Sequence, residues 1–274
     1  SSADYAPNLQ QCVDDGNDLC LSVGFLTADA IWTAALDNPT TSFAIVDYHW
    51  DEAYPANLRS LTFAMDEAGY LAGTLAAEMT ANDAVGVVGG IPVPAVVEYV
   101  EGYRSGARCV NPNVNILLDY ASSFTDPEYG AHTTQWMLDN GADVIFAAAG
   151  QTGNGAILTA TQSGAWGIGV DIDQYITLFE NGAVTGADHL LSSAMKHLDN
   201  GVYATIADLV AGTFTAGTVR YDLAADGVGL APFHEADPSV PQIVRDALAA
   251  AEQGIISGTI DVYELGRSGA PGST

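Results

Sequence analysis

One lysine and two closely spaced aspartates carry the clearest chemical signal in this sequence. Lys196 is the only lysine among 274 residues, which include 34 acidic and seven basic side chains. It follows the segment 169–174, which contains Asp171 and Asp173. In a chain with so few cations, this lysine is a candidate for pairing with an anion or holding a hydroxyl-rich ligand. The alternative is an ordinary solvated position on a helix.

Asp171 and Asp173 lie at the end of a predicted strand, so in an extended segment their side chains would share a face. Paired carboxylates can perform acid–base chemistry or hold a metal ion, and a carboxylate can also accept hydrogen bonds from two vicinal ribose hydroxyls. Asp173 also suits the N-cap of a following helix. We therefore favour ligand binding for Asp171 and capping over binding for Asp173.

Two glycine-rich turns, each between a predicted strand and a predicted helix, could bring backbone N–H groups close to a ligand. They are the segments 89–92 and 150–155, which include Gly90, Gly150 and Gly153. Neither contains the phosphate loop G-x-x-x-x-G-K-[ST] or the dinucleotide pattern G-x-G-x-x-G. Ordinary connecting turns are the alternative for both.

Several classes of function are disfavoured. A net charge of −27 argues against binding to nucleic acid or anionic membranes, because phosphate contacts need clustered Arg and Lys. The sequence has no G-x-S-x-G, H-E-x-x-H or C-x-x-C motif, and its five histidines are scattered singly. No apolar run reaches the roughly 18 residues that span a bilayer. We expect no catalysis, metal ion or cofactor.

The three cysteines leave the redox compartment open. Cys12 and Cys20 are close enough in sequence to form a disulfide in an oxidising compartment, which would leave Cys109 unpaired. Free buried thiols are the alternative.

Short apolar segments alternate with helical patterns, which predicts an α/β fold built on parallel sheets. Strands are predicted at 19–24, 43–47, 61–63, 85–88, 114–120, 144–148 and 167–170, and helices at about 27–36, 66–79, 94–109, 127–140, 195–212 and 241–253, with a further helix between the last two strands. Ligands bind at the carboxyl-terminal edge of such sheets. Two sets of these elements in tandem indicate two similar lobes.

Many ordered motifs resemble the basic membrane protein family, the purine-nucleoside-receptor-like substrate-binding lipoproteins of ABC importers. The resemblance runs from residue 2 to about residue 262, and the matching stretches are 2–9, 23–25, 43–47, 69–77, 85–90, 102–106, 123–126, 141–146, 149–155, 168–174 and 193–196. It implies a type I periplasmic-binding-protein fold, with two doubly wound parallel-sheet lobes joined by a hinge. The expected lobes are 1–83 with about 189–216, and 84–188 with about 217–262, followed by a flexible tail at 263–274.

The resemblance also implies a ligand site. A purine nucleoside would lie in the cleft between the lobes, which close on it by hinge motion. Asp171 and Lys196 would hold the sugar, Asp47 would lie near the base edge, and Phe146 is a candidate stacking ring, although a Phe inside a strand is commonly a core residue. The full expected ligand-binding set is Phe25, Asp47, Gly90, Phe146, Gly150, Thr152, Gly153, Asp171, Asp173 and Lys196.

The function implied by this resemblance is an extracytoplasmic, lipid-anchored substrate-binding protein that delivers its ligand to an ABC permease. The alternatives are binding of a flavin or another flat heteroaromatic molecule, and a signalling or surface protein that keeps the fold. A nucleoside-cleaving enzyme would need a metal or an activated water beside Asp171 and Asp173, and the sequence supplies no second ligand cluster for it.

One departure from the family pattern concerns the start of the chain. Family members begin with a strand and a helix before the segment that matches residues 2–9, and that first unit carries a loop that contacts the base. We expect the corresponding strand to lie between the strands 19–24 and 43–47, because its loss would leave backbone groups unpaired. It would then be a separate piece, and direct pairing of those two strands would contradict this expectation.

Overall fold

The computed structural model describes residues 2–263, and these fall into two compact units. Unit 1 consists of residues 2–63 together with Leu198–Gly227, and unit 2 consists of Ala64–His197 together with the described residues from Val228 onward. The chain passes between the units at Phe63–Ala64, at His197–Leu198 and at Gly227–Val228.

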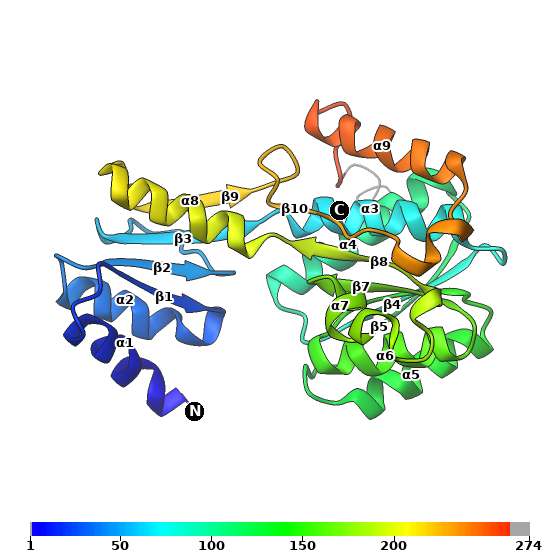
Figure 1. The fold of residues 1–274 in the computed structure, drawn as a ribbon, viewed down its shortest axis with the longest axis horizontal. Helices are drawn as coiled ribbons and strands as arrows, with labels where there is room; N and C mark the ends of the chain where they lie inside the picture. The colour runs from blue at the N-terminus through cyan, green and yellow to red at the C-terminus, as the bar shows by residue number, and fades with distance from the viewer. Residues whose placement is uncertain (1, 264–274) are drawn as a thin grey trace, which may run out of the picture. The chain divides into compact units, whose positions relative to one another are not determined.

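Unit 1 is built on one four-stranded parallel sheet with the order β1-β2-β3-β9 (Figure 1). Its strands are β1 (Leu19–Val23), β2 (Ser42–Val46), β3 (Leu58–Phe63) and β9 (Gly217–Tyr221). Its helices are α1 (Tyr5–Asp14), α2 (Ala28–Asp37) and α8 (Leu198–Ala211), with the 3-10 turns η1 (Ser2–Asp4) and η2 (Phe25–Thr27).

The first two strands of this sheet pair directly, which contradicts the expected site of an additional strand. Leu19 lies opposite Ser42, and the register continues in parallel to Val23 opposite Val46. The backbone groups that β2 turns toward β1 therefore already have hydrogen-bonding partners, and β1 is an edge strand. No gap exists between β1 and β2.

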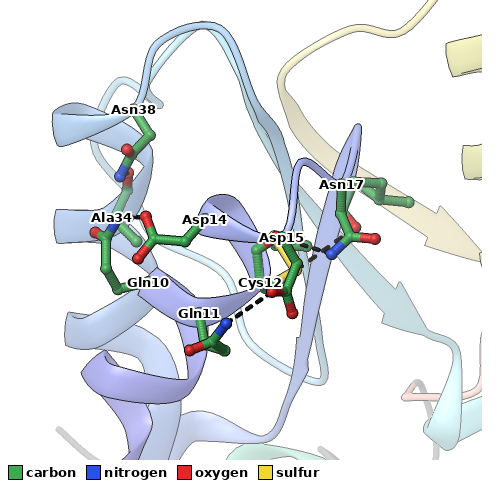
Figure 2. Close-up of a disulfide and its surroundings, with 10 residues drawn as sticks. Gln10, Gln11, Cys12, Asp14, Asp15, Asn17, Ala34 and Asn38 are labelled. Carbon is green, nitrogen blue, oxygen red and sulfur yellow. Dashed lines mark hydrogen bonds between the residues drawn. A yellow bond between two sulfur atoms is a disulfide. The ribbon is translucent and has the colours of Figure 1, made fainter.

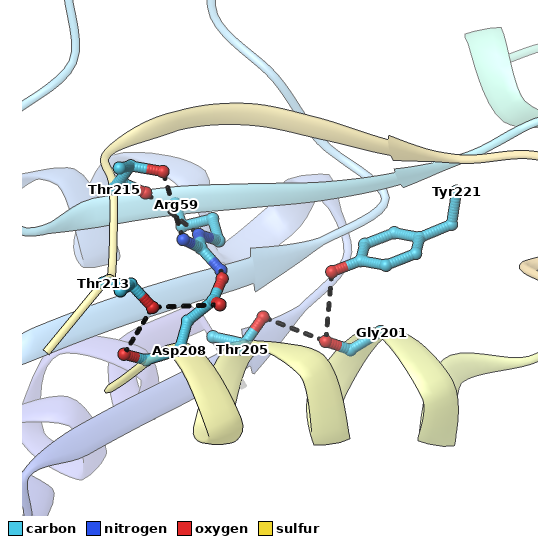
Figure 3. Close-up of polar contacts among 7 residues, drawn as sticks. All are labelled: Arg59, Gly201, Thr205, Asp208, Thr213, Thr215 and Tyr221. Atoms are coloured by element: carbon cyan, nitrogen blue, oxygen red, sulfur yellow. Dashed lines mark hydrogen bonds and ion pairs between the residues drawn. The ribbon is translucent and has the colours of Figure 1, made fainter. Parts of the chain in front are cut away.

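Successive side chains of β3 point to opposite faces of this sheet. Leu58 belongs to the apolar cluster formed with α1, α2 and β2. Arg59 and Phe63 point to the opposite face and contact α8, where the Arg59 guanidinium binds Asp208 and the Phe63 ring lies against Gly201. Figure 3 shows the Arg59 contacts. The sheet is therefore covered on both faces, as parallel sheets require.

Unit 2 is built on a six-stranded sheet with the order β10-β8-β7-β6-β4-β5, in which only β10 runs antiparallel. Its strands are β4 (Ala84–Gly89), β5 (Asn115–Tyr120), β6 (Val144–Ala148), β7 (Trp166–Asp171), β8 (Leu190–Lys196) and β10 (Val228–Leu230). Its helices are α3 (Met65–Met79), α4 (Pro94–Val110), α5 (Pro127–Asp139), α6 (Gly150–Gln162), α7 (Gln174–Thr177) and α9 (Gln242–Ile256), with the 3-10 turns η3 (Glu180–Gly182), η4 (Ala187–His189) and η5 (His234–Ser239).

Helices cover both faces of this second sheet, as Figure 1 shows. α3 and α4 pack on one face and α5 and α6 on the other, while α9 packs on α3. The parallel α/β architecture predicted from the sequence is thus present in both units.

Glycines allow α3 and α4 to approach unusually closely. A Cβ at Gly73 of α3 would lie 1.9 Å from the carbonyl oxygen of Tyr103 on α4, and a Cβ at Gly106 of α4 would lie 2.0 Å from the Tyr70 carbonyl oxygen on α3. Real Cβ atoms do not approach oxygen so closely, so only glycine permits this packing. α3 therefore belongs with unit 2, although residues 66–79 were expected in the first lobe.

Two strands also lie in a different unit from the one expected. β8 was placed in the first lobe, but it pairs with β7 in the sheet of unit 2. β9 was placed in the second lobe, but it pairs with β3 in the sheet of unit 1. Pairing partners rather than sequence position decide these assignments. The expected tail at 263–274 lies outside the described residues, apart from Tyr263.

The end of β8 corrects one element boundary as well. A helix was predicted from residue 195, but Met195 and Lys196 are the last residues of β8, and α8 begins at Leu198. Lys196 is therefore a strand residue and not a solvated helical one.

Cys12 and Cys20 form a disulfide that ties α1 to β1, which resolves the alternative left open by the sequence (Figure 2). Cys109 is a free, exposed thiol on α4. Between residues 2 and 263, no helix is long and apolar enough to cross a membrane.

Candidate functional site

Asp171 and Lys196 meet at the carboxyl-terminal edge of the unit 2 sheet. They are the last residues of the neighbouring parallel strands β7 and β8, in which Asp171 lies opposite Met195. The Lys196 Nζ lies 3.2 Å from Asp171 Oδ1. The lysine side chain is 8% exposed and the aspartate side chain 48% exposed. The Asp171 carboxylate is therefore accessible to solvent, whereas the Lys196 side chain that pairs with it is largely buried.

Asp171 has a strained backbone. Its φ is +67°, and the Ile172 N–H donates to the Val170 carbonyl at 2.8 Å, which makes Asp171 the central residue of a three-residue γ-turn. Such conformations are sparsely populated for residues other than glycine and concentrate at functional sites. The sequence analysis expected Asp171 and Asp173 to share a face because an extended segment would join them. The strand ends at the Asp171 turn, so the two residues are not joined by an extended segment.

Asp173 is used within the protein. Its Oδ1 accepts the Tyr175 N–H at 3.1 Å as the N-cap of α7, and its Oδ2 lies 2.7 Å from His234 Nε2. The capping role favoured from the sequence is therefore present. With both oxygens engaged, Asp173 serves the turn rather than presenting a free carboxylate to a ligand.

Gly90 and Gly150 lie at the same edge and are covered by one aromatic ring. A Cβ at Gly90 would lie 2.4 Å from the ring of Phe124, and a Cβ at Gly150, whose φ is +58°, would lie 3.1 Å from the Phe124 carbonyl oxygen. That carbonyl accepts the N–H groups of Gln151 and Thr152 at the start of α6. The amino end of α6 is thus occupied by Phe124 and is not an open anion site.

Thr152 and Gly153 have structural roles. The fully buried Thr152 hydroxyl accepts the Asp126 N–H at 2.9 Å and donates to the Ser123 carbonyl at 3.1 Å. The Gly153 N–H donates to Ala149 within the first turn of α6. Thr152 therefore holds the segment 123–126 against α6, which fixes the position of Phe124, whereas Gly153 belongs to the first turn of the helix.

Phe146 is a core residue in this structure. It is fully buried in β6, its ring stacks on Tyr103 with 5.2 Å between centroids, and Tyr99 approaches its edge. Because α4 supplies both of these aromatic contacts and the Phe146 side chain is 0% exposed, its ring is not available to stack on a ligand in this structure, contrary to the expectation from the sequence.

Phe25 and Asp47 belong to unit 1 and follow its first two strands. Phe25 is 41% exposed in η2, directly after β1. Asp47 follows β2 with φ +61°, and its N–H donates to the Leu61 carbonyl at 3.0 Å. Each unit therefore carries an aspartate with a left-handed backbone at the end of a parallel strand, Asp47 in unit 1 and Asp171 in unit 2.

Two residues that contact the predicted site residues, Phe124 and His234, were not predicted from the sequence. Phe124 lies in a matching motif, but nothing in the sequence told that its ring covers Gly90. His234 comes 61 residues after Asp173, so only the folded chain pairs them. No group of three or more His, Cys, Asp or Glu side chains in the described part of the chain could hold a metal ion.

A cavity of about 240 Å³ in unit 1 lies between α1 and β1, beside the disulfide. None of the expected ligand-binding residues lines it; its lining residues are Tyr5, Asn8, Leu9, Cys12, Leu21, Ser22, Val23 and Thr27.

Known proteins resemble this chain over most of its length. A family model described as ABC transporter substrate-binding protein PnrA-like matches residues 1–265. The CD4+ T-cell-stimulating antigen of Listeria monocytogenes is 35% identical over 280 residues, covering 96% of this chain and 75% of the antigen. The ABC transporter nucleoside-binding protein BmpA of Lactococcus lactis is 33% identical over 273 residues, covering 96% of this chain and 76% of that protein.

The fold has solved counterparts as well. The solute-binding protein of an ABC transporter system from Aeropyrum pernix superposes with a TM-score of 0.80 at 24% identity, covering 95% of this chain and 81% of that protein. This likeness shows that the chain has the type I fold of periplasmic solute-binding proteins. The family match over the described residues, supported by these relatives, places the chain in the PnrA-like family of ABC transporter substrate-binding proteins.

Proposed function

We propose that this protein binds a purine nucleoside outside the cytoplasm and delivers it to an ABC permease. The observation that carries the proposal is the Asp171–Lys196 pair at the carboxyl-terminal edge of the unit 2 sheet. Open parallel sheets bind their ligands at this edge.

The pair suits the hydroxyls of a ribose. The Asp171 carboxylate can accept two hydrogen bonds from vicinal hydroxyls, and the ammonium group of Lys196 can donate to a hydroxyl oxygen. Because the two side chains neutralise each other, the pair favours a neutral hydroxylated ligand over an anion. Hydrogen bonds to charged groups each contribute about 1.5–3 kcal/mol.

Phe124 takes the role that was expected of Phe146. Its ring lies over Gly90, at the end of β4, and its backbone is held by α6. Phe124 is only partly buried, unlike Phe146. A base stacked on such a ring gains about 1–3 kcal/mol. We assign Phe124 as the aromatic contact that unit 2 offers to the base.

The proposal includes hinge closure on the ligand. Three passages of the chain join the two units, and such connections absorb the backbone rotation in proteins that close by a hinge. The ligand favours closure only to the extent that it binds the closed state more tightly than the open state. Small-angle X-ray scattering should therefore show a smaller radius of gyration with ligand than without it.

The disulfide supports an extracytoplasmic location, because disulfides persist in oxidising compartments and are rare in the cytosol. The BmpA relative is named as a nucleoside-binding protein, which supports the choice of ligand class.

Mass spectrometry of the small molecules released by denaturing the purified protein tests the proposal. A purine nucleoside at near-stoichiometric amount supports it. A protein that arrives without ligand is then titrated with adenosine, guanosine, inosine and riboflavin. Binding of riboflavin alone, or of none of the four, would contradict the proposed ligand class.

A further inference from the structure

We infer that His234 is a positioning residue that holds the Asp171 turn in the geometry needed for ligand binding. The inference rests on the proposed function and adds to the site a residue that does not touch the ligand. It is drawn from the contacts that surround Asp173, the residue two positions after Asp171.

His234 binds the turn in two ways. Its Nε2 lies 2.7 Å from Asp173 Oδ2, and its ring stacks on Tyr175 with centroids 4.1 Å apart and planes 9° apart. The Asp173 side chain is 13% exposed and that of His234 24% exposed, so water competes little for this contact. His234 itself has a left-handed backbone, with φ +44°.

A further contact anchors the outer side of the stack. The Tyr175 hydroxyl donates to Glu235 Oε1 at 3.2 Å. Gly182 leaves room for this contact, because a Cβ there would lie 2.6 Å from Glu235 Oε1 and 2.8 Å from the Tyr175 hydroxyl. Two neighbouring residues of η5 therefore hold this segment: His234 contacts both Asp173 and Tyr175, and Glu235 contacts Tyr175.

The turn needs an external hold. Asp171 is the centre of a γ-turn with positive φ, a conformation that persists only where the surroundings determine it. Only Ile172 lies between Asp171 and Asp173, whose side chain is held by His234. Ile172 is 48% exposed, so its own packing does little to fix the turn. Fixing Asp173 therefore limits the rotation available to the Asp171 backbone, and with it the direction of the carboxylate.

A matched pair elsewhere in unit 2 provides the control. His189 Nδ1 lies 3.1 Å from Asp188 Oδ1, and the His189 ring stacks on Trp166 with centroids 5.1 Å apart. Trp166 is the first residue of β7, so this pair lies at the opposite end of the strand that ends in Asp171, roughly 16 Å away at 3.3 Å per residue. Both pairs join a histidine that stacks on an aromatic ring to an aspartate, but the His189 pair is more exposed and lies away from the site.

The test compares nucleoside affinity among variants by calorimetry, using inosine or whichever purine nucleoside the wild type binds best. We expect His234→Ala to weaken binding roughly tenfold, the scale on which residues that orient a ligand-contacting group act at other sites. His189→Ala should leave the affinity unchanged. His234→Gln, which carries the same left-handed strain as His234→Ala but restores a donor, should recover part of the loss.

A double-mutant cycle separates positioning from general stability. If His234 acts through Asp171, then His234→Ala should have no further effect on the affinity of the Asp171→Ala variant. Equal losses in both backgrounds would overturn the inference, as would an unchanged affinity in His234→Ala. A wild type that binds no nucleoside, or an Asp171→Ala variant that binds normally, would instead contradict the proposed site itself, so the two failures are distinguishable.

Discussion

Lys196 Nζ lies 3.2 Å from Asp171 Oδ1, across the ends of two neighbouring parallel strands. The lysine side chain is 8% exposed, whereas that of the aspartate is 48% exposed. The pair therefore has a largely buried cation and an accessible carboxylate, which is the arrangement expected if Asp171 accepts hydrogen bonds from the ligand while Lys196 both holds Asp171 and donates to a ligand hydroxyl.

Replacement of Lys196 by Met should weaken nucleoside binding by about 10–150-fold, the equivalent of a charged hydrogen bond. Its free energy of unfolding should change by less than about 1 kcal/mol, because Asp171 is half-exposed and can be solvated. Calorimetric titration measures the first quantity and urea unfolding the second.

The matched control for this variant is Arg104→Met, which removes the same charge from the pair with Glu101 on α4. It should leave the affinity unchanged. Equal losses of affinity in the two variants would show that net charge, and not the site, is responsible.

Gly73→Ala should destabilise unit 2 by about 3 kcal/mol, since its Cβ would lie 1.9 Å from the Tyr103 carbonyl oxygen on α4 and the helices must separate. Gly229→Ala is the control, because the nearest atom to its Cβ is His197 Cε1 at 4.0 Å and its φ is not positive. Thermal unfolding followed by circular dichroism measures both variants. Equal melting temperatures for the two would contradict the close helix packing.

The pair of Arg59 and Asp208 predicts a specific acid sensitivity in unit 1. The hydrogen bond from the buried Arg59 guanidinium holds the pKa of Asp208 below its usual 3.8 (Figure 3). A carboxyl whose folded-state pKa is depressed contributes stability above its unfolded pKa, and this contribution is lost as the pH falls through the folded-state value.

The free energy of unfolding of the wild type should therefore fall more steeply than that of Asp208→Asn between about pH 5 and pH 2. Urea unfolding at stepped pH measures both slopes. Comparison with the variant cancels the effect of the other 33 acidic groups, which protonate in both proteins. Parallel slopes would contradict the pair's contribution.

The disulfide predicts a thiol count. Under non-reducing conditions, the native protein should react with one equivalent of iodoacetamide, at the exposed Cys109, and with three after reduction and unfolding. Replacing Cys12 and Cys20 with Ala should cost about 2.5 kcal/mol by the chain-entropy estimate for so short a loop. Labelling of three thiols without reductant would show that the disulfide is absent.

The sequence predicted the α/β class and most elements because apolar strands and helices alternate regularly. It misplaced the start of a helix at Met195, since the segment 190–196 is short and mixes apolar with polar residues without a period that distinguishes strand from helix. It missed β9 and β10, which are short and partly exposed edge strands. The direct pairing of β1 with β2 depends on contacts between distant segments, which spacing along the chain does not reveal.

The sequence predicted only those site residues whose type and local sequence pattern point to a role in binding. Asp171 was singled out because it ends a predicted strand, and Lys196 because it is the only lysine in the chain and because the family resemblance implies a role for it. That Lys196 ends the neighbouring strand was not predicted. Phe146 was a candidate stacking ring with a core position as the alternative, and the structure has it in the core, because β6 is buried along its whole length. The roles of Phe124 and His234 depend on residues far away along the chain, and only the folded structure brings them together.

Calorimetric titration of the wild type and of Asp171→Ala with a purine nucleoside tests the central claim most directly. We expect one site per chain in the wild type and a loss of affinity of at least about tenfold in Asp171→Ala, with the melting temperature of the variant preserved. Equal affinity in the two proteins would contradict the assignment of Asp171 to the ligand site, and absence of binding in the wild type would contradict the proposed ligand.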